Sequence, residues 1–578
     1  MKKIFMLFLM SFLLILVGCK NDADLNNDAD LNENTYSFNL SIESVTPLRE
    51  SIVLNVKLSD EEKLLTKSNV TYTLVEKETD KQVKSSTVTF TDNASEIKII
   101  SLTAGTEYVV TFTTGYKGKN ILLAEKEITT STLGTEKKPY EITTAEELKN
   151  FVTNDRSAYF KLANDIDFAG TYLDPLCKSS STFTGHFDGN GKSLKNFKTG
   201  APDDPATTGN EATYLNVSYG GLFGYVASSA TIKNLTFDGA EVYLYRSSTV
   251  NYGLLAGFNA GTIEGVTVKN SKISYIAKGT STYYIGGIVG YNADFGKVTN
   301  CVVENTTLEV TGTNGDYIVG GVVARNEAPT EKPVRNIIDG CKFIGGNITV
   351  TTDGSQTVST LEEQVRIEVG GIIARNFSLV QNCESSAAIT VNADNQITSN
   401  IELEVGKELE GDVPFINVLV GGLVADNNKS TSVLKNSKSA ATFAVSTEKT
   451  TITLNVTKKV EEGDPVKETS VYAATVYVGG LAGKNGITAE TNAVISNCEY
   501  NFEGENTVKV FDSSIENNIG FGVVGKDFVN VSGNVNKAHT YKVEHYVYET
   551  QDAGTENEKE VLVLGTTDTI TIAEVKAN

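Results

Sequence analysis

Apolar and polar residues alternate with a period of two along most of this chain, and the alternation returns around one glycine-rich segment. Near-copies of the pattern Gly-Gly-apolar-apolar-Gly/Ala-x-Asn begin at residues 220, 253, 286, 320, 370, 421, 479 and 521. Period two with β-branched residues is typical of strands, whereas no stripe with the helical period of about 3.6 residues is present. Self-similarity over tens of residues is typical of a solenoid. We therefore predict an all-β chain whose main part, residues 140–535, is a right-handed parallel β-helix.

A second short element follows the glycine-rich segment in most copies. Its third residue is always Asn or Gly, the two residue types that tolerate positive φ. These residues are Asn234, Gly265, Asn300, Gly340, Asn382, Asn436 and Asn497. We expect a corner between two strands at this position, after which residues such as Leu235 and Phe237 point inwards.

The longer repeats gain their residues just before the Gly-Gly strand. The insertions are Thr349–Glu368, Thr390–Asn417 and Thr442–Tyr477. We expect them to form strands around polar turns such as Thr352–Gly354 and Glu461–Asp464. All three should project from the same corner, as insertions in solenoids do.

Alternating segments between Tyr36 and Thr132 predict a β-sandwich over residues 35–133. The run Leu102–Phe112 resembles the E–F corner of fibronectin type III domains. This resemblance implies a bond from the Tyr108 hydroxyl to the upstream backbone, and a role as a spacer.

A capping box of Thr144 and Glu147, with Glu147 reaching back to the Thr144 amide, predicts a helix that covers the first edge of the solenoid. Residues 536–578 predict a closing hairpin.

The N-terminus has the pattern of an export signal. Lys2 and Lys3 precede the apolar run Ile4–Val17, which predicts a signal peptide over residues 1–18. The stretch Leu16-Val17-Gly18-Cys19 resembles the lipobox of bacterial lipoproteins, which implies that Cys19 carries acyl chains and anchors the protein in the membrane at the cell surface. An ordinary signal peptide with a chance Cys is the alternative. Residues 19–34 predict a flexible tether, for whose Asp residues calcium binding is a second interpretation.

Composition narrows the range of partners. The net charge is 50 − 72 = −22 and no cluster of Lys and Arg occurs, which argues against nucleic acid as a partner. No Cys or His spacing of a zinc site is present, so we predict no metal and no cofactor. Cys301, Cys341, Cys383 and Cys498 share one position of the repeat. An exported chain could join them as disulfides, but a shared inward position favours free buried thiols.

Two adjacent positions of the repeat are candidates for a special role. The last position holds Asn259, Asn292, Asn326, Asn376, Asn427 and Asn485. We interpret these residues as a structural ladder of amides, because equivalent side chains of stacked coils lie about 4.8 Å apart. The preceding position begins with Tyr225, Phe258, Tyr291, Arg325 and Arg375. We expect it to face solvent, either as a plain exposed ladder or as a ligand-binding stripe.

The Gly-Gly pattern together with Ile-x-Asn-Cys resembles the GLUG-type repeats of bacterial surface proteins, some of which adjoin immunoglobulin-A-cleaving metallopeptidases. The resemblance covers about Tyr140–Val531 and implies an architecture rather than an activity. The peptidase activity is not implied, because none of His186, His539 and His545 is followed by Glu, as a zinc motif of that type requires.

These observations predict a non-enzymatic surface lipoprotein, adhesin-like or scaffolding, whose partner is a host protein, an envelope protein or a glycan. A polysaccharide lyase or hydrolase is the alternative, with Asp165, Asp167 and Asp188 as candidate carboxylates, although Asp188-Gly-Asn-Gly191 is also explained as a turn. A glycan-binding stripe is a further alternative. It would consist of Tyr243, Tyr245, Tyr275, Tyr283 and Tyr284.

Overall fold

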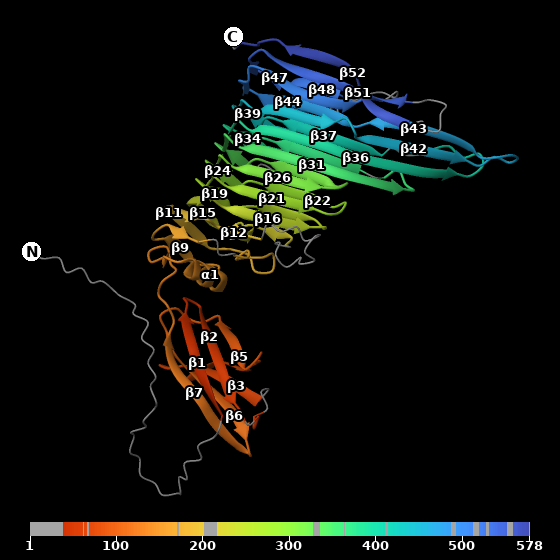
Figure 1. Cartoon of the computed structure of the whole chain (residues 1–578). Coiled ribbons are helices and arrows are strands. Elements are labelled where there is room, and N and C mark those ends of the chain that lie inside the picture. Colours follow the sequence, from red (N-terminus) through yellow and green to blue (C-terminus); the bar gives the residue numbers. More distant parts are fainter. Residues whose placement is uncertain are drawn as a thin grey trace, which may run out of the picture.

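The computed structural model describes residues 38–61, 63–65, 69–169, 173–200, 217–327, 336–362, 364–410, 414–486, 493–512, 519–527, 531–551 and 559–576. It has a small β-sandwich at one end, a tall stack of strands at the other, and the short helix α1 (Ala145–Asn154) between them (Figure 1). Within these ranges no helix is long and apolar enough to cross a bilayer. The signal peptide, the tether and Cys19 lie outside the described residues.

Two antiparallel sheets form the sandwich, in the strand orders β1-β2-β5 and β4-β3-β6-β7. The strands are β1 Phe38–Pro47, β2 Ser51–Asp60, β3 Val70–Glu76, β4 Lys81–Thr87, β5 Ala94–Ile100, β6 Glu107–Tyr116 and β7 Lys119–Thr129. Alternate residues face the space between the sheets, so Leu54, Leu74 and Phe112 are fully buried. The Tyr108 hydroxyl accepts a hydrogen bond from the backbone N–H of Thr103 at 3.0 Å, which is the upstream bond expected from the sequence.

The main body is a parallel β-helix, as the repeat pattern predicted. Three sheets of 19, 12 and 14 strands form its walls. A typical coil adds β19 and β20 to the first sheet, β21 to the second, and β22 and β23 to the third. Consecutive coils pair in parallel, whereas the pairs β42–β43 and β51–β52 are antiparallel.

The strands of each wall have the following bounds. The 19-stranded sheet contains β8 Tyr140–Ile142, β9 Tyr159–Leu162, β10 Ile166–Asp167, β11 His186–Lys195, β15 Thr231–Asp238, β19 Thr262–Glu264, β20 Thr267–Lys269, β24 Lys297–Thr299, β25 Val302–Glu304, β29 Ile337–Asp339, β30 Lys342–Ile344, β34 Leu379–Gln381, β35 Glu384–Ser385, β39 Val433–Lys435, β40 Lys438–Ser439, β45 Val494–Ser496, β46 Glu499–Tyr500, β49 Val531–Ser532 and β50 Val535–Asn536. The 12-stranded sheet contains β12 Lys198–Thr199, β16 Glu241–Arg246, β21 Lys272–Ala277, β26 Thr307–Gly312, β31 Asn347–Val358, β36 Ala388–Leu403, β41 Thr442–Thr447, β42 Thr451–Lys458, β43 Val466–Ala473, β47 Glu505–Phe511, β51 His539–Gln551 and β52 Lys559–Ile572. The 14-stranded sheet contains β13 Tyr219–Gly220, β14 Phe223–Val226, β17 Val250–Gly253, β18 Ala256–Asn259, β22 Thr282–Gly286, β23 Val289–Asn292, β27 Asp316–Gly320, β28 Val323–Asn326, β32 Gln364–Gly370, β33 Ile373–Asn376, β37 Phe415–Gly421, β38 Val424–Asn427, β44 Thr475–Asn485 and β48 Ile519–Asp527.

The corners of the 19-stranded sheet lie where the Asn and Gly pattern predicted them. Asn234, Gly265 and Asn300, for example, have φ values of 56°, 62° and 52°. After each corner the chain runs extended again, and residues such as Leu235 and Phe237 are fully buried inside the solenoid. One continuous apolar core runs through all the coils, because no single coil can enclose a core by itself.

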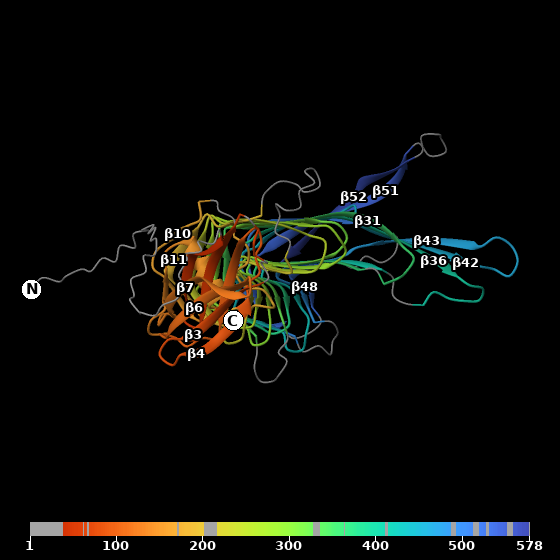
Figure 2. The ribbon, with the colours of Figure 1, turned by 90° about the horizontal axis from the view of Figure 1, so that it is seen from below.

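The insertions of the longer repeats project together. β36, β42 and β43 reach furthest from the body and, together with β31, form a blade on the right-hand side of Figures 1 and 2. The predicted turn at Thr352–Gly354 is wrong: these residues continue β31 and pair with Ala393–Asn395 of β36. The neighbouring strand supplies backbone partners to both ends of the segment, and this pairing outweighs the turn preference of Asp and Gly. Glu461–Asp464 does connect β42 to β43 as a turn.

Both ends of the solenoid are covered. At the first coil, Thr144 caps α1 by accepting from the Glu147 amide at 3.1 Å. The Glu147 carboxylate bonds the backbone N–H of Thr143 at 2.8 Å rather than that of Thr144, so this half of the capping box is displaced by one residue. At the last coil, β51 still stacks in parallel on β47, and only β52 reverses direction to close the sheet.

The sandwich is joined to the first coil by specific contacts. The Tyr140 hydroxyl accepts from the backbone N–H of Arg49 at 2.6 Å, and the Arg49 guanidinium donates to the Ser157 hydroxyl at 2.9 Å. Leu48 and Val53 of the sandwich belong to the apolar core of the solenoid. The two parts therefore share an interface as well as a linker.

Candidate binding surface

The residue before the last position of each repeat lies on the outer side of the 14-stranded sheet, in register with its equivalents. We call this row the outward ladder. It consists of Tyr225, Phe258, Tyr291, Arg325, Arg375, Asp426, Lys484 and Lys526. Its aromatic side chains are half-buried, whereas the residues on either side of each of them in the strand are buried. The structure thus brings the predicted stripe residues together on adjacent strands.

The first two rings of the outward ladder are stacked, and the third ring is tilted against the second. The ring centroids of Tyr225 and Phe258 are 4.3 Å apart with an interplanar angle of 15°, and those of Phe258 and Tyr291 are 5.4 Å apart at 33°. Stacked rings cover each other's faces, so the ladder presents mainly ring edges and hydroxyl groups to solvent.

A second row on the preceding strands lies beside the first. We call it the companion ladder. It consists of Tyr219, Asn251, Tyr284, Ile318, Glu368, Leu419 and Tyr477. Tyr219 meets Tyr225 edge to face at 5.8 Å, and Tyr284 meets Tyr291 in the same way at 5.8 Å. We call these four rings together with Phe258 the aromatic cluster. Tyr219 was not predicted as a member, because it lies one residue before the first glycine of its repeat, whereas Tyr284 lies two residues before Gly286.

Arg325 lies at the border of the aromatic cluster. Its guanidinium donates to the Tyr284 hydroxyl at 2.8 Å and lies 5.0 Å from the centroid of the Tyr291 ring. A guanidinium at this distance from an aromatic ring is stabilised by a cation–π interaction. Glu327 pairs with the guanidinium and accepts from the Tyr291 hydroxyl at 2.6 Å. The cluster therefore ends in a charged pair.

Arg375 is less available to a ligand than the stripe interpretation expected. Its guanidinium donates to both carboxylate oxygens of Glu368, and the two side chains are only 12% and 3% exposed. The reason is geometric, because Glu368 occupies the companion ladder directly beside it. We therefore confine the candidate surface to the aromatic cluster and Arg325.

Asp426 follows Arg375 in the outward ladder and is a buried acid. One carboxylate oxygen accepts from the Asn428 amide, and the other has no hydrogen-bond partner among the described residues. Burial, followed by repulsion from Glu368, raises the pKa of Asp426 to about 7 despite the attraction of Lys484 and Arg375. At neutral pH the ionised carboxylate is thus a cost to the folded state.

Replacing Asp426 by Asn should change the pH dependence of stability. A carboxylate whose folded pKa is raised adds stability below its unfolded pKa of about 4, and that contribution is lost as the pH rises to about 7. We expect Asp426→Asn to stabilise the protein at pH 8 by on the order of 3 kcal/mol and to have little effect at pH 4. Urea unfolding at both pH values measures this difference. Asp464→Asn, in the exposed turn of the blade, is the control, and an equal gain from the control would contradict the prediction.

The Asn residues of the last repeat position form a continuous buried ladder. The Nδ2 of each residue donates to the Oδ1 of the next at 2.8–3.0 Å, and all six side chains are fully buried. Several also bond the backbone of the following turn, as Asn376 does with both polar groups of Ser378 at 3.1 Å. The amides thereby satisfy one another and the corners, and no ligand is needed to explain them.

Residues 281–308 match the GLUG motif. The matched segment holds β22, β23 and the corner at Asn300, and therefore corresponds to about one coil of the solenoid. Over 144 residues the chain is 31% identical to a protein of Evansella cellulosilytica named as a Gly-rich membrane protein, an alignment that covers 24% of this chain and 15% of the relative. Over 199 residues it is 27% identical to halomucin of Haloquadratum walsbyi, covering 32% of this chain and 2% of the relative. The chain thus spans only a small part of the length of these relatives.

The alternative glycan-binding stripe does not form. Tyr275 and Tyr283 are 1% and 0% exposed, and their rings lie inside the solenoid with centroids 5.5 Å apart. They point inwards because they share the parity of core residues such as Ile273 and Ile285 on the same strands. Of the others, Tyr243 and Tyr245 belong to the 12-stranded sheet and Tyr284 to the 14-stranded sheet.

The carboxylates that a hydrolase would use, Asp165, Asp167 and Asp188, already accept hydrogen bonds at the corners of the coils. The pKa of Asp165 is lowered by its hydrogen bond from Lys195 and then by a backbone amide, and the pKa of Asp167 is lowered by the Asn196 amide. Asp188 accepts from a backbone N–H two residues on, at 2.8 Å, as in a turn. The general acid of a glycosidase needs a raised pKa instead.

The buried thiols form no disulfide among the described residues. Cys177, Cys301, Cys341, Cys383 and Cys498 are all free. In the same part of the chain, no group of three or more His, Cys, Asp and Glu side chains could hold a metal ion. Cys301, Cys341, Cys383 and Cys498 are each at most 1% exposed, so this repeat position holds small side chains in the core.

Proposed function

We propose that this protein is a surface protein that binds another protein through the aromatic cluster. The observation that carries the proposal is the half-buried stack of Tyr225, Phe258 and Tyr291 on one rigid sheet. Tyr and Arg are enriched where proteins contact each other, and aromatic anchors dominate the binding energy of such contacts. Each ring is held by its neighbours, so little side-chain entropy is lost on binding.

The arrangement favours a protein over a glycan as the partner. Sugars stack on exposed ring faces, whereas the faces in the outward ladder are largely covered by neighbouring rings. Hydroxyl groups and the Arg325–Glu327 pair at the border instead match the polar groups of a polypeptide. We propose no catalytic role for this surface.

Replacing Phe258 by Ala should weaken binding of the protein partner. The substitution removes the middle ring of the stack, and loss of a central aromatic anchor typically costs at least about tenfold in affinity. Arrays of host proteins, envelope proteins and glycans probed with the full chain identify the partner, and titration of the variant measures the loss. Tyr243→Ala, a half-buried Tyr on the 12-stranded sheet, is the matched control.

Three results would count against the proposal, one from the arrays and two from companion assays of polysaccharide turnover and of retention by cell wall. Binding to glycans alone would favour a carbohydrate-binding surface. Turnover of a labelled polysaccharide by the chain would indicate an enzyme. Retention by purified cell wall without binding to any array would support a scaffold of the cell envelope.

We further propose that the protein is lipid-anchored at the cell surface. The support is the lipobox-like Leu16–Cys19 together with the name of one relative, a membrane protein. Residues 35–133 would be a fibronectin-III-like spacer, a proposal supported by the three-plus-four strand arrangement and the Tyr108 bond. Residues 140–535 would then be the displayed repeat array, and residues 536–578 its cap.

Replacing Cys19 by Ser should release the protein from the membrane. Without the thiol no thioether-linked lipid can form, and stable anchoring needs more than one acyl chain. We expect the variant to lose labelling by radioactive palmitate and to leave the membrane fraction. Cys177→Ser, at a buried thiol of the first coils, should keep both properties. Equal membrane retention of the Cys19 variant would contradict the proposed anchor.

A further inference from the structure

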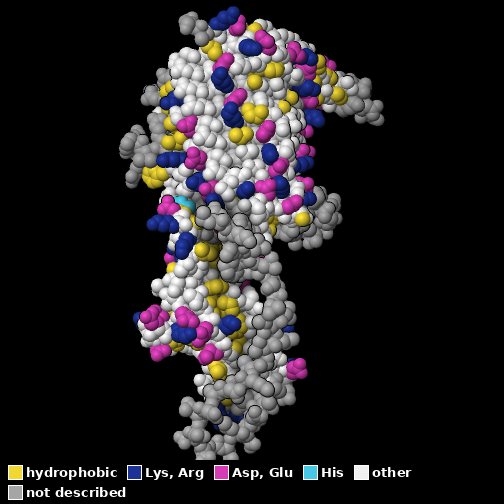
Figure 3. All heavy atoms as spheres, turned by 90° about the vertical axis from the view of Figure 1, so that its left-hand side faces the viewer, with side chains coloured by type: hydrophobic (Ala, Val, Ile, Leu, Met, Phe, Trp, Pro, Cys, Tyr) yellow, Lys and Arg dark blue, Asp and Glu magenta, His cyan; other side chains and the backbone are white. Residues whose placement is uncertain are grey.

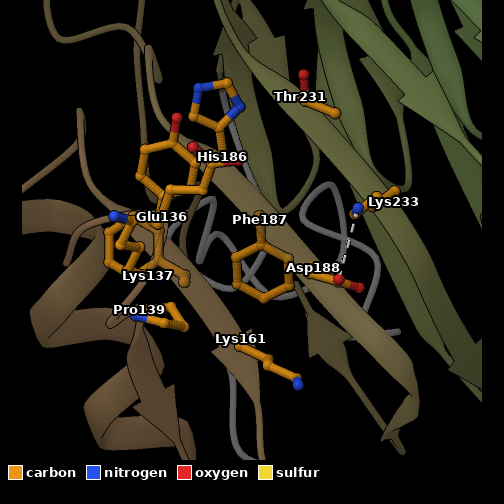
Figure 4. Close-up of a pocket in the computed structure, with 11 residues that line it drawn as sticks. Glu136, Lys137, Pro139, Lys161, His186, Phe187, Asp188, Thr231 and Lys233 are labelled. Atoms are coloured by element: carbon orange, nitrogen blue, oxygen red, sulfur yellow. Dashed lines mark ion pairs between the residues drawn. The ribbon is translucent and has the colours of Figure 1, made fainter.

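A pocket of about 530 Å³ opens on the outer side of the first coils. Outward side chains of β9, β11 and β15 form its floor, and Glu136, Lys137 and Pro139 form one wall. In the floor, Tyr159, His186 and Thr231 make one row across the strands, and Lys161, Asp188 and Lys233 make the next. Figure 4 shows the labelled residues spread over the wall and successive strands, with His186 at one end of the group and Lys161 at the other. We call this site the cap pocket, and its volume is in the range of small-ligand sites.

Hydrogen-bond donors predominate among the polar groups of the cap pocket. They are the ammonium groups of Lys137, Lys161 and Lys233, the hydroxyls of Tyr159 and Thr231, and the imidazole of His186. The rings of Tyr159 and His186 stack at 4.3 Å, which holds both polar edges in fixed positions. The Lys161 ammonium and the His186 imidazole have no hydrogen-bond or ion-pair partner among the residues that the structure describes. Glu141 lies opposite Lys161 on β8, but no ion pair joins them.

The charge of the cap pocket differs from that of the chain. Three Lys residues and two carboxylates line it and Glu141 lies beside Lys161, so the site is close to neutral in a protein with a net charge of −22. Asp188 is already engaged by Lys233 at 3.7 Å and by the Asn234 amide at 3.1 Å. Elsewhere on this face of the molecule basic and acidic side chains are mixed (Figure 3). An unpaired cation in a pocket favours an anionic ligand.

We propose that the cap pocket binds an anionic saccharide, a sugar that carries a carboxylate or sulfate group. Lys161 would hold the anionic group, whereas His186, at the other end of the pocket, and Lys137, from the wall, would donate to further oxygen atoms of the saccharide. Asp188 and Glu136 would accept hydrogen bonds from sugar hydroxyls. A polyphosphate is disfavoured, because these two carboxylates would repel it. This site is separate from the aromatic cluster, and the proposal does not depend on the protein partner proposed above.

The test is calorimetric titration of the full chain with four probes. They are trigalacturonate, a heparin-derived tetrasaccharide, neutral maltotriose and ATP. We expect at least one of the two anionic saccharides to bind, at least about tenfold more tightly than maltotriose and ATP, with an affinity that falls as salt is raised. Lys161→Met should weaken this binding by about tenfold, because a hydrogen bond to a charged group is lost, and His186→Ala should weaken it by about threefold, because a bond to a neutral oxygen is lost.

Two control variants show whether the saccharide binds at the cap pocket. Lys297→Met removes an exposed cation in the same outward row as His186, three coils away, and should leave the affinity unchanged. Phe258→Ala should also leave it unchanged, whatever happens to protein binding. Failure of both anionic saccharides to bind, equal binding of maltotriose, tighter binding of ATP, or an equal loss in Lys297→Met would overturn the proposal.

Discussion

Replacing Gly421 by Ala is expected to prevent the central coils from closing. A Cβ at this position would lie 1.8 Å from the carbonyl oxygen of Val424 and 2.9 Å from the backbone nitrogen of Gly483. Both atoms belong to the backbone of the sheet, so no side-chain rotation relieves the collision. We expect a loss of at least about 4 kcal/mol in the free energy of unfolding, at the upper end for single substitutions.

The urea dependence of the β-sheet signal in circular dichroism measures this loss. Gly565→Ala on β52 is the matched control, because a Cβ there would meet its nearest atom, the carbonyl oxygen of His545, at an ordinary contact distance of 3.4 Å. A Gly421→Ala variant as resistant to urea as the control would show that the glycine is not required for close approach of the backbone.

Replacing Asn376 by Leu is expected to produce the next largest loss of stability. The Asn376 side chain makes five hydrogen bonds inside the solenoid: two along the amide ladder, two to the backbone of Ser378 and a longer one to the Val433 carbonyl. Leu has a similar volume but leaves the Ser378 N–H and the Asn427 Oδ1 without these partners, whereas the Ser378 carbonyl still accepts from the Val433 N–H. At about 1–3 kcal/mol for each unpaired group, and allowing for relaxation, we expect a loss of about 3 kcal/mol.

Asn455→Leu provides the comparison for this substitution. Asn455 also bonds the amide of an equivalent Asn, Asn400, at 2.9 Å, but on the outside of the blade, where solvent replaces the lost bond. We expect a cost of no more than about 1 kcal/mol there. Hydrogen exchange of the amides in β33 and β38 would locate the opening in Asn376→Leu. If the two variants were equally stable, the buried amide ladder would not contribute to the stability of the solenoid as we expect.

The repeats were readable from the sequence because each coil places one constraint at one fixed position. A corner needs positive φ, and only a few residue types accept it, so Asn234, Gly265 and Asn300 mark corners directly. The amide ladder follows in the same way from the Asn that ends each repeat. In both cases the constraint is local, and stacking repeats it from coil to coil.

Features that depend on a neighbouring strand were not readable in this way. Thr352–Gly354 has the composition of a turn, but β36 extends far enough to pair with it and keeps it in a strand. Tyr275 and Tyr283 were grouped with Tyr243 and Tyr245, although their parity on β21 and β22 turns them inwards. Arg375 is not available to a ligand because it pairs with Glu368, which belongs to a different row of the same sheet.

The same distinction between local features and features that depend on neighbouring strands applies to the candidate binding sites. The outward ladder was visible as one column of the repeat, so Tyr225, Phe258 and Tyr291 could be named in advance. The companion ladder that completes the aromatic cluster, and the cap pocket at the first coils, arise from packing between strands. Neither site can be recognised from the spacing of its residues in the sequence.

Distances between spin labels test the central claim, a single in-register parallel stack, most directly. Lys233, Glu264, Thr299, Asp339, Gln381, Lys435 and Ser496 form one outward row of the 19-stranded sheet. At about 4.8 Å for each coil, labels at Lys233 and Lys435 should lie about 24 Å apart, and labels at Lys233 and Ser496 about 29 Å apart. Two narrow distributions that differ by about one strand spacing are the expected result. Broad distributions at much longer distances, as for separate globules on a flexible chain, would contradict the solenoid.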